Sequence, residues 1–336
     1  MSNSFLRESK LYIEYGGTKY RIYTSSAVSL DQTFAEDSYS VKTLHDQSKM
    51  FEGSIINKAN PASFGFEIPL TIEQDESVII ELLGGLTAGQ LNKFNIYLVT
   101  TSSTFKLENA IITSASMDFI PENPFMIRIE GEGTKVSRVG DENFTVDDAE
   151  GADSAFIALT PPTAIGSTPS NYWTIDGSNQ LPSSTRTPLM VYPVITATPS
   201  GGSSLNMNNI ISVNFQLEND INWTNYTTLH NSLSSNTMFP SAYTVEKRTA
   251  SGEIRQYQID NNNSGDNVRQ FDDFSTNTDL TITAKNVSGN ASFFTVAINP
   301  VMYTARMQVA EVFTQSYDFR SLDNTDPITT QISYYS

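Results

Sequence analysis

The 336-residue chain has no cysteine and only two histidines. The absence of cysteine excludes disulfide bonds, thiolate nucleophiles and cysteine-based metal sites. Two histidines are too few for a His-rich metal site, so we expect no metal and no other cofactor. Basic residues are also scarce: 20 Lys and Arg stand against 37 Asp and Glu, and the formal net charge is −17. Such a chain lacks the basic clusters that grip phosphates, so nucleic acid should be repelled and not held.

Long apolar runs are missing as well. No segment approaches the roughly 18 consecutive apolar residues of a membrane span, and residues 1–8 contain no apolar stretch of signal-peptide length. We therefore expect synthesis in the cytoplasm and no membrane partner. Charged residues make up 17% of the chain, while Ser, Thr and Asn are abundant and aromatic residues reach 11%. This bias favours short strands and exposed loops over long surface helices, and it predicts a mainly β protein.

The tripeptide Thr-Leu-His occurs twice and contains both histidines. It covers residues 43–45 and 228–230, so His45 and His230 lie 185 positions apart. A Met-Phe pair follows each copy, at residues 50–51 and 238–239. We interpret the two copies as a diverged tandem duplication, because repeats of this spacing are too long for a solenoid and suit whole domains.

The duplication predicts two domains joined by a tether. The first domain covers residues 1–140 and the second covers residues 187–336. Residues 141–186 contain an acidic cluster followed by Pro, Ser, Thr, Gly and Asn. A segment of this composition cannot build its own core, so it is expected to be a linker.

Four features of the first copy are predicted from local patterns. Residues 11–23 are expected to form a hairpin with a glycine turn, and residues 38–62 a long loop or extended hairpin that projects from the domain. Acidic residues followed by an apolar run predict a helix within residues 73–83, with a glycine in the left-handed conformation just after it. Amphipathic strands are predicted over residues 105–133. A shorter helical turn is expected at residues 268–274 of the second copy.

No catalytic motif is found: there is no phosphate-binding glycine loop, no Gly-X-Ser-X-Gly and no His-Glu-X-X-His. The two histidines lie at equivalent places of a repeat without a nucleophile motif, which favours a structural or interfacial role. Glu130 and Glu132 share one face of a predicted strand, as glycosidase carboxylates can, but a polar sheet face is the simpler interpretation. We predict no catalytic residue and no enzyme activity.

The layout resembles the tail tube fold of phage tail tubes, type VI secretion tubes and tail-hub proteins. The resemblance is carried by the strand, acidic segment and helix of residues 64–85, the long loop at 38–62 and the strands at 105–133. It implies two tandem tail-tube-like β-sandwich or barrel domains, each with a short flanking helix.

The resemblance also implies a function, namely that of the duplicated major tail tube subunit of some long-tailed siphophages. Three such chains would form a trimeric, pseudo-hexameric ring, and stacked rings would enclose an acidic channel through which DNA passes during ejection without specific binding. The expected location is the phage tail of the virion, after synthesis in the host cytoplasm. The expected partners are the chain itself and the tail terminator, distal tail or hub, and tape measure proteins.

Two sets of residues follow from this implied function. The loops expected to contact the next ring contain Leu44, His45, Met50, Phe51, Ile55, Ile56, Leu229, His230, Met238 and Phe239. The residues expected to line the channel are Asp118, Glu130, Glu132 and Glu311.

Two other functions are compatible with the sequence. A tail-hub or distal tail protein of the phage tail tip can also contain two tube-like domains. A carbohydrate-binding adhesin would use Trp173, Trp223 and Tyr226 as stacking residues, although packing in a core or an interface is the plainer role for each of them.

Overall fold

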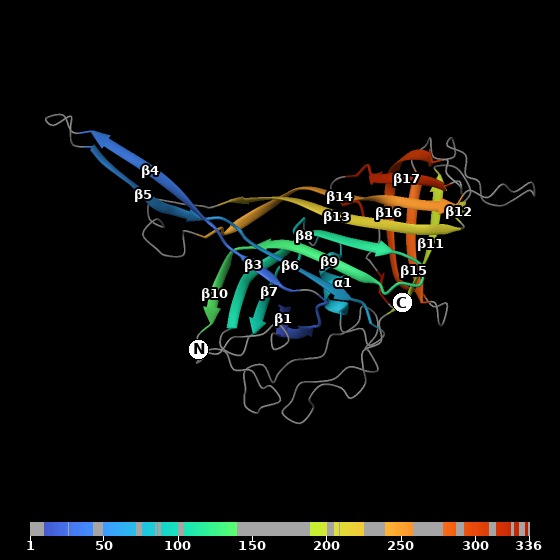
Figure 1. Ribbon diagram of the computed structural model, residues 1–336, viewed down its shortest axis with the longest axis horizontal. Coiled ribbons are helices and arrows are strands. Elements are labelled where there is room, and N and C mark those ends of the chain that lie inside the picture. Colours follow the sequence, from blue (N-terminus) through green and yellow to red (C-terminus); the bar gives the residue numbers. More distant parts are fainter. Residues whose placement is uncertain are drawn as a thin grey trace, which may run out of the picture.

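The structure is a computed structural model, and the protein it shows is mainly β, as the composition predicts (Figure 1). The described residues are 10–25, 27–42, 50–71, 76–84, 86, 89–99, 104–139, 189–199, 205–207, 209–224, 239–257, 278–286, 292–308, 314–323, 326–328 and 333–334. The linker, the helical turn predicted at 268–274, Trp173 and Tyr226 lie outside them. Among the described residues, no helix has the length and apolar character needed to cross a membrane.

We divide the elements into two halves. The first half comprises β1 (Lys10–Tyr15), β2 (Thr18–Ile22), β3 (Ser29–Asp31), β4 (Phe34–Lys42), β5 (Met50–Ala59), β6 (Ala62–Pro69), α1 (Ser77–Leu83), β7 (Phe94–Val99), β8 (Thr104–Phe119), β9 (Met126–Gly133) and β10 (Lys135–Val139). The second half comprises β11 (Val191–Pro199), β12 (Leu205–Met207), β13 (Ile210–Thr224), β14 (Ala242–Tyr257), β15 (Thr278–Asn286), β16 (Ser292–Gln308), β17 (Thr314–Ser321) and β18 (Ser333–Tyr334).

The same pairing pattern occurs in both halves. In the first half β2 pairs with β1, β1 with β7, β7 with β8, β8 with β9, and β9 with β6. In the second half β12 pairs with β11, β11 with β15, β15 with β16, β16 with β17, and β17 with β14. All of these pairs are antiparallel.

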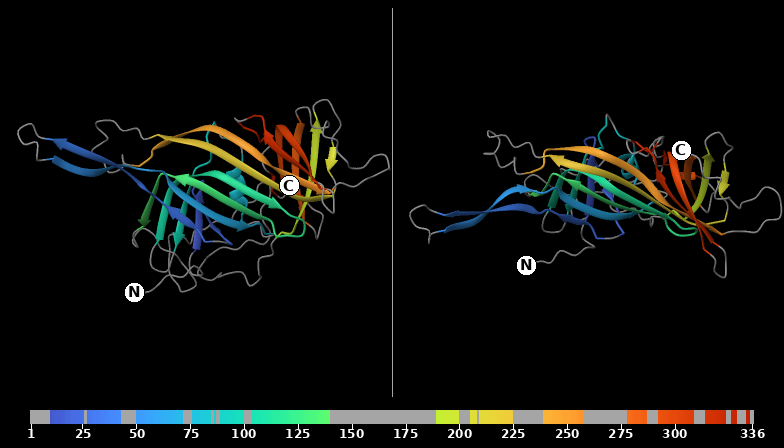
Figure 2. Two further views of the ribbon diagram at one scale, coloured as in Figure 1. Left: turned by 45° about the horizontal axis from the view of Figure 1, so that its top comes forward. Right: turned by 90° about the horizontal axis from the view of Figure 1, so that it is seen from above.

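The two halves meet edge to edge in one sheet. Residues 114–119 of β8 pair with residues 213–218 of β13, so the order β3-β6-β9-β8-β13-β14-β17-β16 is continuous. The long strands β8, β9, β13 and β14 run side by side through the middle of the molecule (Figures 1 and 2). The domain boundaries at residues 140 and 187 stay a prediction. The two halves are joined by the backbone pairing of β8 with β13.

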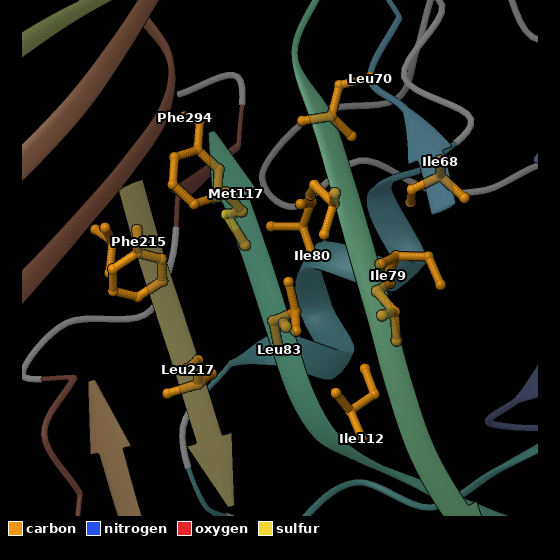
Figure 3. Packing of buried hydrophobic residues seen from close by; sticks show 14 of the residues in the cluster. Ile68, Leu70, Ile79, Ile80, Leu83, Ile112, Met117, Phe215, Leu217 and Phe294 are labelled. Atoms are coloured by element: carbon orange, nitrogen blue, oxygen red, sulfur yellow. The ribbon is translucent and has the colours of Figure 1, made fainter. Parts of the chain in front are cut away.

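The hydrophobic core is also shared. Phe119 and Phe125 of the first half contact Phe294 of the second, with ring centroids 5.9 and 5.6 Å apart. Figure 3 shows Phe294 and Phe215 beside Met117 of β8, to the left of Ile79 and Ile80 of α1. Burying large aromatic side chains contributes on the order of 2 kcal/mol each, so this junction is part of the folded core and not a loose contact between domains.

The segment predicted as a long loop or extended hairpin is a hairpin. Strands β4 and β5 form a separate two-stranded sheet, which we call the arm. The arm extends away from the body in every view (Figures 1 and 2). Phe34, Tyr39 and Ile56 on it are 49%, 49% and 57% exposed. An isolated two-stranded hairpin is only marginally stable in water, so the arm needs a surface to lie on.

The helix predicted within 73–83 forms at Ser77–Leu83, but its ends differ from the prediction. Gly84 has φ −56° and is not in the left-handed conformation. The Arg248 guanidinium of β14 instead donates hydrogen bonds of 2.7 Å to the carbonyl oxygens of Leu83 and Gly84. Free carbonyls at a helix end need donors, and a side chain from the second half supplies them.

The acidic start of the helix was also predicted wrongly. The first turn contains no acidic residue, and Glu76, at the N-cap position, makes no side-chain capping hydrogen bond. The Glu76 carboxylate is buried and accepts hydrogen bonds from the hydroxyl and the backbone N–H of Thr71. These bonds tie Glu76, at the start of α1, to Thr71, which follows β6.

Candidate functional site: the polar face of the shared sheet

The shared sheet has one apolar and one polar face. In β9, Ile127 and Ile129 are buried against the core, whereas Arg128 and Glu130 are exposed. The strands β6, β8, β13 and β17 show the same alternation. Because side chains alternate across a strand, the pairing registers place the outward residues of all these strands on a single surface.

One row of cross-strand neighbours on this surface is markedly acidic. Asp118 lies opposite Asn214, Asn214 opposite Glu253, Glu253 opposite Asp318, and Asp318 opposite Thr304. The Asn214 side-chain amide donates a hydrogen bond of 2.7 Å to the Asp118 carboxylate. The row crosses from β8 of the first half to β16 of the second, so both halves contribute to one acidic stripe.

The direct opposition of Glu253 and Asp318 would be unfavourable by itself, because like charges across a strand pair repel. Two arginines on the same face offset the repulsion. Arg306 lies 3.0 Å from the Asp318 carboxylate, and Arg255 lies 4.0 Å from that of Glu253. Both pairs are solvent-exposed and so contribute little stability, which leaves the face acidic but not uniformly so.

Most of the chain matches one protein-family model. The model of a family described as the Bacteriophage Baseplate Tube Protein Family matches residues 1–151 and 170–335. The chain belongs to this family. It is therefore a structural protein of the phage tail or baseplate, and a component of the virion tail. No curated protein matches the chain.

Three of the four residues predicted to line the channel of this baseplate tube family member lie on the polar face. Asp118 and Glu130 are exposed there. Glu132 is half-buried, because the indole N–H of Trp223 donates a hydrogen bond of 2.7 Å to its carboxylate. Glu311 lies outside the described residues. Glu253 and Asp318 were not predicted as channel residues, although the period-two alternation of residues 314–321 is a signal that could have found Asp318.

Of the ten residues predicted to contact the next ring, five are not among the described residues. Leu44, His45, Leu229, His230 and Met238 lie outside the described residues, in segments that connect β4 to β5 and β13 to β14. Both copies of Thr-Leu-His thus fall between the two strands of a hairpin.

The remaining predicted contact residues lie on or beside the hairpins. Met50, Phe51, Ile55 and Ile56 belong to β5, and only the side chain of Ile56 is described, as largely exposed. Phe239 precedes β14, and the Lys135 ammonium of β10 lies 4.9 Å from its ring centroid. Phe239 therefore contacts its own chain.

Within the described part of the chain, no group of three or more His, Cys, Asp or Glu side chains is placed to hold a metal ion. His45 and His230 lie outside the described residues, so this statement does not include them.

Trp223, considered above as a sugar-stacking residue, is used within the fold. Its indole N–H binds Glu132, and its ring packs 5.3 Å from the ring of Tyr243, measured between centroids. Trp223 thus has the packing role that was the plainer of its two predicted roles.

Proposed function

We propose that copies of this chain close into a ring whose inner wall is the polar face of the shared sheet, and that the ring is part of a tube through which phage DNA passes. The observation that carries the proposal is a pair of open sheet edges. Among the described residues, no strand pairs with the outer edge of β3, nor with residues 304–308 of β16 on the side opposite β17. Native proteins seldom leave such edges uncovered.

The junction inside the chain suggests how the two edges meet. The strand β16 has the same partners in the second half as β8 has in the first, and β3 holds the place of β13. If β16 joins β3 of the next chain as β8 joins β13, Met307 would lie opposite Leu30. The contact is head-to-tail, and a head-to-tail contact builds a ring when its rotation closes.

The repeated pairing pattern and the repeated Thr-Leu-His support a duplication. Each half would then supply one tube domain, and three chains would supply a pseudo-hexameric ring. Stacking of such rings would bring the tips of the hairpins, including Leu44, His45, Leu229 and His230, against the neighbouring ring.

The charge of the polar face suits a DNA channel. Acidic side chains repel phosphates, so a polyanion can slide past without being trapped. The residues assigned to the channel wall are Asp118, Glu130, Glu253 and Asp318. Glu132 is not among them, because its carboxylate accepts the hydrogen bond from Trp223.

Two positions in the tail are compatible with such a ring. The chain could be the major tail tube subunit along the whole tail, in contact with the terminator and tape measure proteins. It could instead form the tube segment at the baseplate, in contact with the distal tail or hub proteins, and the description of its family favours this second position. The number of copies per virion, measured by quantitative mass spectrometry against a capsid protein, separates the two: many rings for the first, one or a few for the second.

Electron microscopy of the purified protein tests the ring itself. The expected images are hollow rings or tubes with threefold symmetry and Met307 of one chain beside Leu30 of the next. Monomers at every protein and salt concentration would overturn the proposal.

A further inference from the structure

The same surface occurs in both halves of the chain, but only one copy of it is covered. In the first half, Ile111 and Glu132 lie opposite each other on β8 and β9. Ile111 is fully buried, in a cluster with Leu91 and Tyr243. The cover is the far end of the β13–β14 hairpin: Tyr243 donates a hydrogen bond of 2.9 Å to the Leu91 carbonyl, and Trp223 binds Glu132.

In the second half, Met302 and Arg320 occupy the matching place. They lie opposite each other on β16 and β17, which pair as β8 and β9 do. A neighbouring landmark fixes the match: Gly131 precedes Glu132 and faces Phe64, while Phe319 precedes Arg320 and faces Gly252. Met302 is 45% exposed, and Arg320 is exposed as well.

The arm matches the covering hairpin in the same way. The β13–β14 hairpin has a register shift between Asp220 and Ile221, and the arm has one between Ala35 and Glu36. These shifts lie 185 positions apart, the spacing of the two Thr-Leu-His copies.

The pairs next to these shifts can therefore be matched. The pair of Ile221 with Val245 corresponds to the pair of Glu36 with Ile56. The first pair packs on the Ile111 cluster. Of the second pair, Glu36 is exposed and Ile56 is 57% exposed.

We propose that the arm of one chain lies on the Met302–Arg320 surface of the next chain, with Ile56 against Met302 and Glu36 paired with Arg320. Both partners of this contact are present and open in every chain, and the hairpin on Ile111 and Glu132 is the template for it. The occupant is therefore a second copy of this chain.

Charge supports the same pairing. Where the covered surface has the acid Glu132, the open one has the base Arg320. Where the covering hairpin has Ile221, two residues before the Trp223 that binds Glu132, the arm has the acid Glu36. The arm and the open surface thus carry opposite charges, which favours the correct register of approach.

This inference rests on the proposed ring and assigns its contacts more finely. Ile56 was predicted above to touch the next ring. Here the base of the arm, with Ile56, belongs to the contact between neighbours in one ring, and only the tip of the arm is left for the next ring.

Cross-linking tests the contact directly, because the chain has no cysteine of its own. The double variant Ile56→Cys/Met302→Cys, treated with a short bismaleimide, is expected to give covalent dimers and trimers on a denaturing gel. The matched control is Tyr39→Cys/Met302→Cys. Tyr39 is 49% exposed and packs over Gly53 on the other face of the arm, so this variant is expected to remain mostly monomeric.

Charge reversal provides the second test. Glu36→Arg and Arg320→Glu are each expected to raise the concentration needed for half-assembly by roughly tenfold, and the double variant is expected to restore it. Sedimentation measures assembly, and circular dichroism checks that each surface variant is folded. Rings that form without the 56–302 cross-link and without charge rescue would overturn this inference and leave the ring proposal intact. A wild-type protein that forms no ring would overturn the ring proposal.

Discussion

The ring of Phe64 lies directly over Gly131 on the neighbouring strand. A Cβ added at Gly131 would overlap the Phe64 ring and the carbonyl oxygen of Ile111. In the second half Phe319 lies over Gly252 in the same manner, with the aromatic residue and the glycine exchanged between strands. An aromatic ring that covers a cross-strand glycine excludes water from the backbone there, and it requires a residue without a side chain.

Replacement of either glycine should therefore destabilise the sheet. Gly131→Ala and Gly252→Ala are each expected to lower the free energy of unfolding by about 1–3 kcal/mol, because the backbone must move to admit the methyl group. Urea denaturation monitored by circular dichroism measures the change. Ser63→Ala, at an exposed position of β6, is the control and should change stability by less than about 0.5 kcal/mol. A Gly131→Ala variant as stable as this control would contradict the close approach.

Arg248 links the second half to the helix of the first. Its guanidinium is buried and also forms an ion pair of 3.2 Å with Asp326. Burial lowers the pKa of Arg248, and the Asp326 carboxylate opposes that shift. Arg248→Met is expected to lower the free energy of unfolding by about 2–4 kcal/mol, since the Leu83 and Gly84 carbonyls lose their donors.

Two further variants separate the parts of this contact. Arg248→Lys should recover only part of the loss, because an ammonium cannot reproduce the planar fork of donors. Asp326→Asn should cost less than Arg248→Met, because Asp326 is 40% exposed. Chemical denaturation of the three variants gives the order, and equal losses for Asp326→Asn and Arg248→Met would show that the ion pair dominates instead.

Glu14 should make stability depend on pH in the acid range. Burial would raise the pKa of its carboxyl, but hydrogen bonds of 2.9 Å from Asn95 and 2.8 Å from Tyr97, together with Lys19, outweigh burial and lower it below 4.5. The folded state thus binds the proton less readily than the unfolded state. The stabilisation by Glu14 is present above about pH 4.5 and is lost as the pH falls through the lowered pKa.

The comparison of wild type with Glu14→Gln measures this effect. The melting temperature of wild type should exceed that of the variant at pH 7, and the difference should shrink as the pH is lowered below 4. A difference that stays constant between pH 7 and pH 3 would show that the charge of Glu14 has no part in it.

The acidic face should prevent assembled tubes from retaining DNA. Asp118→Lys/Glu130→Lys tubes are expected to retain DNA at low salt, whereas wild-type tubes release it, because added cations on the wall neutralise phosphates. Filter binding of assembled tubes at increasing salt measures the difference. Glu122→Lys, at an exposed position in the turn between β8 and β9, is a control for added charge away from the polar sheet face. Equal retention by wild type and the double variant would count against a channel wall at this face.

Much of the local structure was predictable. The alternation of Ile127 and Ile129 with polar residues predicts β9, and the acidic segment followed by an apolar run predicts α1. The hairpin between residues 38 and 62 was predictable as one of two alternatives. The ends of α1 were not predictable, because the hydrogen-bond donors for its last carbonyl oxygens belong to Arg248, which is far away in the chain.

The candidate site was predictable only in part. Asp118, Glu130 and Glu132 could be assigned to outward strand faces from their own neighbours in sequence. The sequence did not predict that Glu253 and Asp318 continue the same row. The registers between β13, β14 and β17 depend on partners that lie tens of residues apart in the chain.

The sequence by itself determined that the protein is mainly β, that it lacks cysteine chemistry, and that Thr-Leu-His recurs at a spacing of 185 positions. These properties follow from residue types and local periodicity. Only the tertiary structure decided that β8 joins β13, that Arg248 closes α1, and that the arm stands without cover while its counterpart lies on Ile111. Edge pairing uses backbone N–H and C=O groups, which every residue except proline carries alike, so the sequence does not reveal which edges meet.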